Sequence, residues 1–124
     1  MQIADVWMDV LLIDDEAEIC LLLDNLLRRK GFRCDTAHSM EEGRERLATG
    51  RYQAVFLDIH LPDGLGYQLI PEIRDKQPEA QVIAISAVDN ERVHAQEQGA
   101  DLFIPKPFNK SSILGGLHTL GITD

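Results

Sequence analysis

The sequence predicts an α/β fold, a doubly wound parallel sheet of five strands in the order 2-1-3-4-5. Short apolar runs alternate along the chain with segments of helical periodicity, as in βα units around a parallel sheet. Four of the runs show no alternation of apolar and polar residues, which is typical of strands buried on both faces. Right-handed crossovers between consecutive strands then place helices on both faces of the sheet.

The length and composition are those of one globular domain, spanning residues 1–124 with its core at about 8–120. No apolar run reaches the ~18 residues of a membrane span, and residues 1–9 lack the basic residues that begin a secretory signal. The net charge of −9 disfavours direct binding to nucleic acid or to an anionic membrane. Two cysteines, Cys20 and Cys34, without a CxxC spacing indicate reduced thiols, so we expect a cytoplasmic protein.

Five segments are predicted as strands. The four continuous apolar runs are residues 10–13, 54–57, 82–85 and 102–104. Residues 32–37 instead alternate, with Phe32, Cys34 and Thr36 set against Arg33 and Asp35. This segment is predicted as an edge strand with one face in water.

The first helix has the clearest periodicity. Acidic residues stand at its start and basic residues 28–30 at its end, which suits the helix dipole, and Gly31 ends it. Its apolar stripe, at helical spacing, consists of Ile19, Leu22, Leu23, Leu26 and Leu27.

The next two helices are marked by their first residues. Ser39 and Glu42 form the pattern of a capping box at the start of a helix that ends at residues 49–50. A third helix is predicted at residues 67–76, where Pro71 either kinks it or moves its start later.

The last two helices have weak signals. Residues 90–98 contain only Val93 and Ala95 as apolar residues, which indicates a weakly anchored helix. Residues 110–120 carry Gly115 and Gly116, each of which costs a helix up to ~1 kcal/mol relative to alanine.

Polar residues follow the predicted strands at the edge where such sheets bind ligands. In the order 2-1-3-4-5 the first and third strands are neighbours, so Asp14, Asp15 and Asp58 share one crevice. Crowded carboxylates repel unless a cation lies between them, and oxygen ligands alone suit Mg²⁺. Ser86 and Lys106 follow the other two strands and add a hydroxyl and a positive charge. Such a set suits phosphoryl transfer onto a carboxylate.

Taken singly, most of these residues have a structural interpretation. Asp14 or Asp15 is a suitable helix cap, Ser86 a suitable loop hydroxyl, and Lys106 an ordinary surface charge. Asp58 is harder to explain in this way, because a charge that closes the apolar run 54–57 is costly unless it is paired or functional. Their coincidence at one edge of the sheet favours a site.

Four short strings at these strand ends resemble the receiver domain of two-component response regulators, over nearly the whole chain. They are LLIDDE (residues 11–16), LDIHLPDGLG (57–66), AISA (84–87) and PKPF (105–108). The resemblance implies the flavodoxin-like (βα)5 fold. It also implies that Asp58 accepts the phosphoryl group, and that Asp15, Asp58 and the His60 carbonyl bind Mg²⁺, or Mn²⁺ as a substitute, with Asp14 acting through a water.

The same resemblance assigns the remaining site residues. Ser86, the Ala87 backbone and Lys106 are expected at the phosphoryl group, and Ser86 and Phe103 are expected to form the switch. Pro62 and Gly66 fit the family pattern after the acceptor, and Lys106–Pro107 is expected to be a cis bond. Val88 and His60 depart from the usual residues at positions tied to the lifetime of the phosphoryl group.

The resemblance also implies partners. A histidine kinase or histidine phosphotransfer protein is the expected donor, and the surface of the fourth helix, fifth strand and fifth helix is the expected output. That surface would meet an output domain, a downstream protein or a second receiver. The domain would catalyse only its own phosphorylation and dephosphorylation, and so is not expected to be an enzyme acting on other substrates.

Three other functions are weighed against the residues. A phosphorylation-independent pseudo-receiver would lack an acidic, acceptor or lysine residue, and none is missing. A flavodoxin-like nucleotide or flavin binder needs a phosphate-cradling loop after the first strand, where residues 14–16 are all acidic. An aspartate-nucleophile phosphatase resembles DxDxT there, whereas this chain reads DDEAE.

Overall fold

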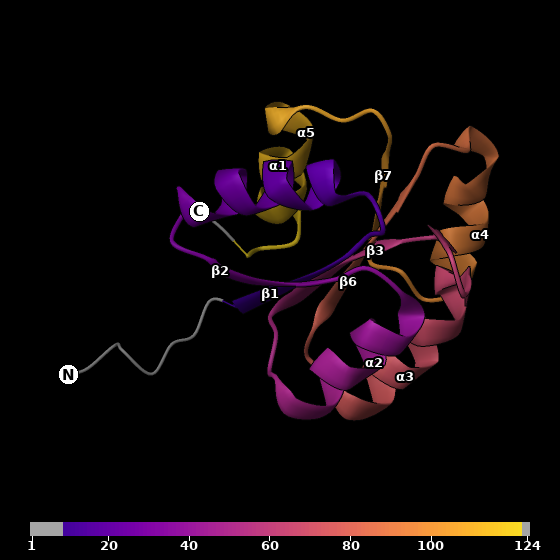
Figure 1. Cartoon of the computed structure of the whole chain (residues 1–124). Coiled ribbons are helices and arrows are strands. Elements are labelled where there is room, and N and C mark those ends of the chain that lie inside the picture. Colours follow the sequence, from indigo (N-terminus) through magenta and orange to yellow (C-terminus); the bar gives the residue numbers. More distant parts are fainter. Residues whose placement is uncertain (1–8, 123–124) are drawn as a thin grey trace.

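The computed structural model describes residues 9–122 and contains a parallel five-stranded sheet (Figure 1). The strand order β2-β1-β3-β6-β7 is the predicted order 2-1-3-4-5. Residue 8, at the start of the expected core, lies outside the described residues. The strands are β1 (Asp9–Ile13), β2 (Arg33–Ala37), β3 (Ala54–Asp58), β6 (Gln81–Ser86) and β7 (Leu102–Pro105).

Helices cover both faces of the sheet (Figure 1). They are α1 (Ala17–Arg28), α2 (Met40–Thr49), α3 (Ile70–Lys76), α4 (Arg92–Glu97) and α5 (Lys110–Thr119). The side chains of α1 and α5 pack on one face, and those of α2, α3 and α4 pack on the other. None of the helices in the described part is both long and apolar enough to cross a membrane.

The three central strands, β1, β3 and β6, are buried on both faces, as their continuous apolar sequences predict, and Phe103 and Ile104 of the edge strand β7 are buried as well. Each residue of β3 is buried, and β1 is buried from Val10 onward. The edge strand β2 alternates between exposed and less exposed positions, which confirms its predicted wet face. Because β1 and β3 carry apolar side chains on both faces, burial of these side chains provides the main stabilisation of the sheet.

The stripe predicted for α1 is only partly correct. Leu23 and Leu27 are buried, but Leu22 is 42% exposed and Leu21 is 61% exposed. Cys20 is buried in their place, and its thiol donates a hydrogen bond to the Asp14 carbonyl oxygen at 3.4 Å. The helix packs against both the sheet and α5, and this packing sets its rotation more narrowly than helical periodicity does.

The caps of α2 and α3 follow the sequence signals. The Ser39 hydroxyl accepts a hydrogen bond from the Glu42 N–H at 3.1 Å, while the Glu42 carboxylate accepts from the N–H of His38 rather than of Ser39. Pro71 lies in the first turn of α3, so the helix begins later than residue 67. A short 3-10 helix, Gly66–Leu69, precedes it, because proline tolerates a first helical turn but not a helix interior.

The fourth helix is shorter than expected and weakly anchored. It spans Arg92–Glu97 after a 3-10 turn, Asp89–Glu91, so the predicted range 90–98 contains two elements. Ala95 is fully buried, whereas Val93 is 62% exposed and anchors nothing in this structure. The position of α4 therefore depends on few apolar contacts.

A small antiparallel pair, β4 (His60–Leu61) and β5 (Gly64–Leu65), follows β3 and was not predicted. Two-residue strands carry no periodicity that a sequence pattern can reveal. The turn of this hairpin is tied to α2, because the Asp63 carboxylate accepts hydrogen bonds from the N–H groups of Met40 and Glu41 at 2.8 and 3.1 Å.

The two glycines of α5 have different surroundings. A Cβ added at Gly116 would lie 2.8 Å from Leu102 Cδ2 and 3.3 Å from Ile104 Cδ1, both on β7. A Cβ added at Gly115 would meet nothing within 4 Å. Gly116 therefore allows α5 to approach the sheet closely, whereas Gly115 only weakens the helix.

This difference gives a stability prediction. Gly115→Ala should raise the free energy of unfolding by about 0.5–1 kcal/mol, because alanine has the higher helix propensity. Gly116→Ala should lower it by about 1 kcal/mol, because the added methyl overpacks the contact with β7. Urea unfolding of the two variants provides the measurement. Equal stabilisation by both substitutions would contradict the close-approach role of Gly116.

Candidate functional site

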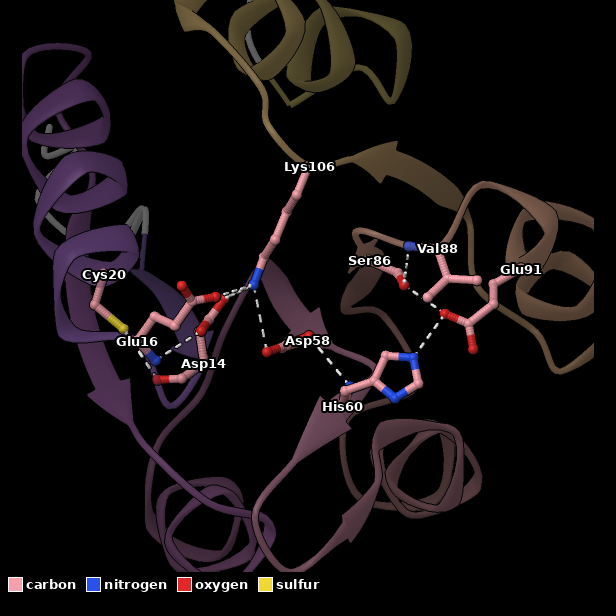
Figure 2. A network of polar contacts seen from close by, with 9 residues as sticks. All are labelled: Asp14, Glu16, Cys20, Asp58, His60, Ser86, Val88, Glu91 and Lys106. Atoms are coloured by element: carbon pink, nitrogen blue, oxygen red, sulfur yellow. Dashed lines mark hydrogen bonds and ion pairs between the residues drawn. The ribbon is translucent and has the colours of Figure 1, made fainter.

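The predicted site residues meet at the carboxyl end of the sheet (Figure 2). Asp14 follows β1, Asp58 ends β3 and Ser86 ends β6, while Lys106 follows β7. Parallel register aligns these strand ends, since Asp58 pairs with Ile85 and Ser86 with Pro105. Residues as far apart in the sequence as Asp14 and Lys106 are thereby brought into contact.

Within residues 9–122, the buried polar or charged residues are Asp14, Asp58 and Ser86. Asp14 is 1% exposed, Asp58 is 4% exposed and Ser86 is fully buried. Burying a carboxylate is costly unless it is paired and hydrogen-bonded. All three of these buried polar side chains lie at one edge of the sheet. This indicates a functional site there rather than interactions that stabilise the fold.

Lys106 provides the compensating charge. Its Nζ lies 2.9 Å from Asp14 Oδ2, 2.8 Å from Glu16 Oε1 and 3.4 Å from Asp58 Oδ2. Burial lowers the pKa of Lys106, but the interactions with Glu16, Asp14 and Asp58 outweigh it and hold that pKa above its ordinary value. The lysine therefore stays charged, and one ammonium group serves three carboxylates.

Asp58 is electrostatically the least satisfied of these acids. Burial and then the charge of Asp14 raise the pKa of Asp58 to about 6, against the opposing effects of Lys106 and the His60 N–H. Its Oδ1 accepts a hydrogen bond from the His60 N–H at 3.2 Å. Because ionisation of Asp58 is unfavourable in this environment, a cation close to its carboxylate stabilises the charged form.

The residues present fit a divalent cation. Asp14, Asp15, Glu16 and Asp58 each offer an oxygen, and these atoms all lie within 4.8 Å of one another. Asp14 Oδ2 is buried and pairs with the Lys106 ammonium at 2.9 Å. Carboxylate oxygens alone, with exposed Asp15 and Glu16 leaving access for water, are the ligand chemistry of a hard cation.

Glu16 was not predicted as a site residue. It is the third acid of the run that follows β1, and its backbone N–H donates to Asp14 Oδ1 at 2.8 Å. Its position directly after two predicted ligands was the available signal. Only the structure shows that its side chain, although 58% exposed, contacts Lys106.

Close backbone packing holds the end of β3 in place. A Cβ at Gly66 would collide with the carbonyl oxygen of Asp58, and the Gly66 N–H donates to the Ile59 carbonyl at 2.7 Å. Gly66 is therefore required by space, as its place in the motif suggested. Pro62 lies in the exposed turn between β4 and β5, and the Lys106–Pro107 bond is cis, as expected.

Ser86 faces a residue that the sequence reasoning missed. Its hydroxyl donates a hydrogen bond to Glu91 Oε1 and accepts one from the Val88 N–H at 3.0 Å. The same Glu91 oxygen lies 2.9 Å from His60 Nε2 (Figure 2). No motif marks Glu91, because its role depends on the turn that places it over the strand end.

The other predicted residues lie nearby. Ala87 follows β6 directly and is exposed at the same edge. Phe103 on β7 is 3% exposed, and the Arg92 guanidinium lies 5.0 Å from its ring centroid. The ring of Phe103, one of the two expected switch residues, is thus already buried in this structure.

A separate cavity of about 620 Å³ lies at the opposite end of the strands. Residues 47–52 and 76–80 line it, and none of the predicted site residues does. The chemistry described above is thus not in that cavity but at the open carboxyl edge of the sheet.

Comparison with known proteins identifies relatives of the chain. A family model described as the response regulator receiver domain matches residues 10–118. The transcriptional regulatory protein DltR of Streptococcus agalactiae is 33% identical over 113 residues, covering 90% of this chain and 50% of that protein. The cell cycle response regulator CtrA of Brucella ovis is 28% identical over 115 residues, covering 91% of this chain and 50% of that protein. The chain therefore spans about half the length of these relatives.

Solved structures have the same fold. A response regulator from Burkholderia pseudomallei, with a phosphorylated aspartic acid and a calcium ion, superposes with a TM-score of 0.82 at 29% identity, over 89% of this chain and 66% of that one. A two-component response regulator from Clostridium difficile gives a TM-score of 0.85 at 26% identity, over 91% and 94% of the two chains.

The pKa of Asp58 leads to a pH prediction for the metal-free protein. The folded state keeps the proton up to about pH 6, whereas an unfolded chain releases it near pH 4. The folded state binds more protons between these values, so the free energy of unfolding should fall as pH rises from about 4 to about 6. Asp58→Asn should remove this fall and raise stability at pH 7 by about 1–3 kcal/mol.

Urea unfolding in the presence of a chelator, from pH 4 to pH 8, measures this effect. Asp75→Asn, which removes an exposed carboxylate from α3, is the control and should keep the pH dependence of the parent. If Asp58→Asn unfolded with the same pH dependence as the parent, the electrostatic description of the site would be wrong.

Proposed function

Because the chain belongs to the response regulator receiver domains of two-component systems, we propose that Asp58 accepts the phosphoryl group in its phosphorelay. The observation that carries the assignment is the burial of Asp58 at the end of β3, with Lys106 Nζ 3.4 Å from its carboxylate. Asp14 is equally buried, but it is closer to Lys106 and its other oxygen holds the Glu16 N–H. Asp58 is therefore the acid better placed to react.

The acidic cluster is proposed to hold Mg²⁺, with Mn²⁺ as a substitute. Asp15, Asp58 and the His60 carbonyl would be direct ligands, and Asp14 would act through a water. When bound, the cation supplies neutralisation of the negative charge on phosphoryl oxygens. The carboxylate oxygens of the cluster, which all lie within 4.8 Å of one another, and the exposed position of Asp15 support this proposal.

The side chains of the site would have separate roles in phosphoryl transfer. An oxygen of Asp58 attacks the phosphorus of the donor in line, and the bond to the donor breaks. Lys106 stabilises the phosphoryl oxygens from one side, and the Ser86 hydroxyl and the Ala87 N–H from the other. Lys106 needs no proton change for this role, because its pKa is held above its ordinary value.

The proposed donor is a histidine kinase or a histidine phosphotransfer protein in the cytoplasm. The domain would act only on itself, by phosphorylation and later hydrolysis of Asp58. The output is proposed to be the surface of α4, β7 and α5, with Ser86 and Phe103 as the switch. An output domain, another protein or a second receiver would recognise this surface, without direct contact of this domain with nucleic acid or membrane.

Phosphorylation is favoured over a phosphorylation-independent binding role. Asp14, Asp58 and Lys106 are all present and in contact, which a pure binding module would not need. The acidic residues that surround Asp14 likewise argue against a flavodoxin-like phosphate or flavin site at this edge. The single acceptor-type aspartate ends β3 and not β1, which argues against an aspartate-nucleophile phosphatase.

The acceptor assignment predicts a single phosphorylation site. With acetyl phosphate and Mg²⁺, the parent protein should gain one phosphoryl group by intact mass spectrometry, and Asp58→Asn should gain none. Asp75→Asn, on the exposed side of α3, should label as the parent does. Labelling of Asp58→Asn to the level of the parent would refute the assignment.

The metal proposal predicts a linked stability change. At a Mg²⁺ concentration ten times the dissociation constant, the free energy of unfolding should rise by about 1.4 kcal/mol, because the cation binds only the folded state. Asp15→Ala should remove most of this gain. Because Asp15 is exposed, its removal should leave the fold of the metal-free protein intact.

Thermal unfolding with and without Mg²⁺ at constant ionic strength tests this expectation. Asp75→Ala is the matched control and should retain the full gain. A parent protein whose melting temperature ignores millimolar Mg²⁺ would count against the metal site, without affecting the acceptor assignment.

A further inference from the structure

Glu91 joins two groups of the site that the proposed function uses separately. One of its oxygens, Oε1, accepts a hydrogen bond from the Ser86 hydroxyl and lies 2.9 Å from His60 Nε2 (Figure 2). The Glu91 side chain is 17% exposed, so these contacts are largely shielded from water. Glu91 ends the 3-10 turn Asp89–Glu91, directly before α4.

The hydrogen bonds of Ser86 leave it no donor for a phosphoryl group. A serine hydroxyl has a single hydrogen to donate, and that of Ser86 goes to Glu91. The Ser86 oxygen also accepts a hydrogen bond from the Val88 N–H, and this contact does not use the hydroxyl hydrogen. Phosphoryl oxygens are acceptors, so Ser86 can serve a phosphoryl group on Asp58 only by leaving Glu91.

We propose that Glu91 is a positioning residue that holds the Ser86 hydroxyl away from Asp58 until the phosphoryl group competes for it. This inference rests on the proposed function, in which Asp58 is the acceptor and Ser86 contacts the phosphoryl group. The carboxylate and the phosphoryl group are two acceptors in competition for one hydrogen. Phosphorylation therefore breaks the Ser86–Glu91 contact as it forms the new one.

A second donor is available to Glu91 after release. The Tyr67 hydroxyl is buried and makes no well-aligned hydrogen bond to a described residue. Burial and then the charge of Glu91 raise the pKa of Tyr67, which places the carboxylate within electrostatic reach of the phenol. The Tyr67 ring also packs edge-on against His94 of α4, with ring centroids 4.4 Å apart.

The turn that carries Glu91 is easily moved. The six residues of α4 bury only Ala95 among their side chains, so few apolar contacts oppose a shift. Loss of the Ser86 contact therefore removes one of the polar contacts that hold this turn, leaving those of Glu91 with His60 and with the Val88 carbonyl. The competition at Ser86 is in this way transmitted to the start of α4.

The test is a double-mutant cycle on the binding of beryllofluoride, a phosphoryl mimic, in the presence of Mg²⁺. Glu91→Ala should tighten binding about 3- to 10-fold, because Ser86 no longer has a hydrogen bond to give up. Ser86→Ala should weaken binding. Adding Glu91→Ala to Ser86→Ala should change the affinity less than about 2-fold, since the competition needs both residues.

Two further variants separate positioning from charge and from folding. Glu91→Gln keeps the shape and an acceptor oxygen, and should fall between the parent and Glu91→Ala. Glu97→Ala removes a carboxylate from α4 that pairs with His94 and does not contact Ser86, and should leave the affinity unchanged. Amide chemical shifts of unliganded Glu91→Gln, which keeps the folded dispersion, should change at Ser86, Val88 and Tyr67.

The outcomes are distinguishable. Equal tightening by Glu91→Ala with and without Ser86 would show a plain charge effect and overturn the inference. Unchanged or weaker binding by both Glu91→Ala and Glu91→Gln would also overturn it, while the acceptor role of Asp58 would stand. A parent protein that binds no beryllofluoride would overturn the proposed function and this inference together.

Discussion

The burial of two carboxylates beside one lysine is the constraint on which the site depends. Asp14 and Asp58 lie at the ends of neighbouring strands, and Lys106 is the positive charge that reaches both. Buried ion pairs gain little net stability, because desolvation offsets their attraction. The arrangement is therefore better explained by the proposed function, in which a cation and a phosphoryl group would relieve the unfavourable electrostatics of the site. The raised pKa of Asp58 is the direct expression of that state.

The scaffold supplies this geometry through packing that is rigid where the site needs it. The register of β1, β3, β6 and β7 aligns four strand ends at one edge. Gly66 allows the chain after β5 to pass against the Asp58 carbonyl, and Asp63 ties the hairpin turn to α2. The apolar strands that carry the acids are buried on both faces, so the acids cannot relax into water without disrupting the core.

The opposite side of the site is built more loosely. Ser86 is fixed at the end of a buried strand, but Glu91 and α4 are held mainly by polar contacts and by Ala95. Phe103 is buried beneath Arg92, so rearrangement on this side involves replacing one set of close contacts with another. Because a rigid acidic pocket lies next to a weakly anchored helix, a small change in free energy at the pocket can shift the populations of different positions of that helix.

The sequence by itself determined the fold class and the acidic pair, because apolar runs and strand-end motifs are local signals. The strand order was predicted from the doubly wound fold, and the structure confirmed it. It also predicted the wet face of β2 and the weakness of α4, and it gave a later start of α3 as one of two possible effects of Pro71. It was wrong about Leu22, since the rotation of a helix depends on what packs against it. Only the tertiary structure revealed Glu16, Glu91 and the close approach at Gly116. Each of these depends on a contact between segments, and the separation of two segments along the sequence does not give their distance in space.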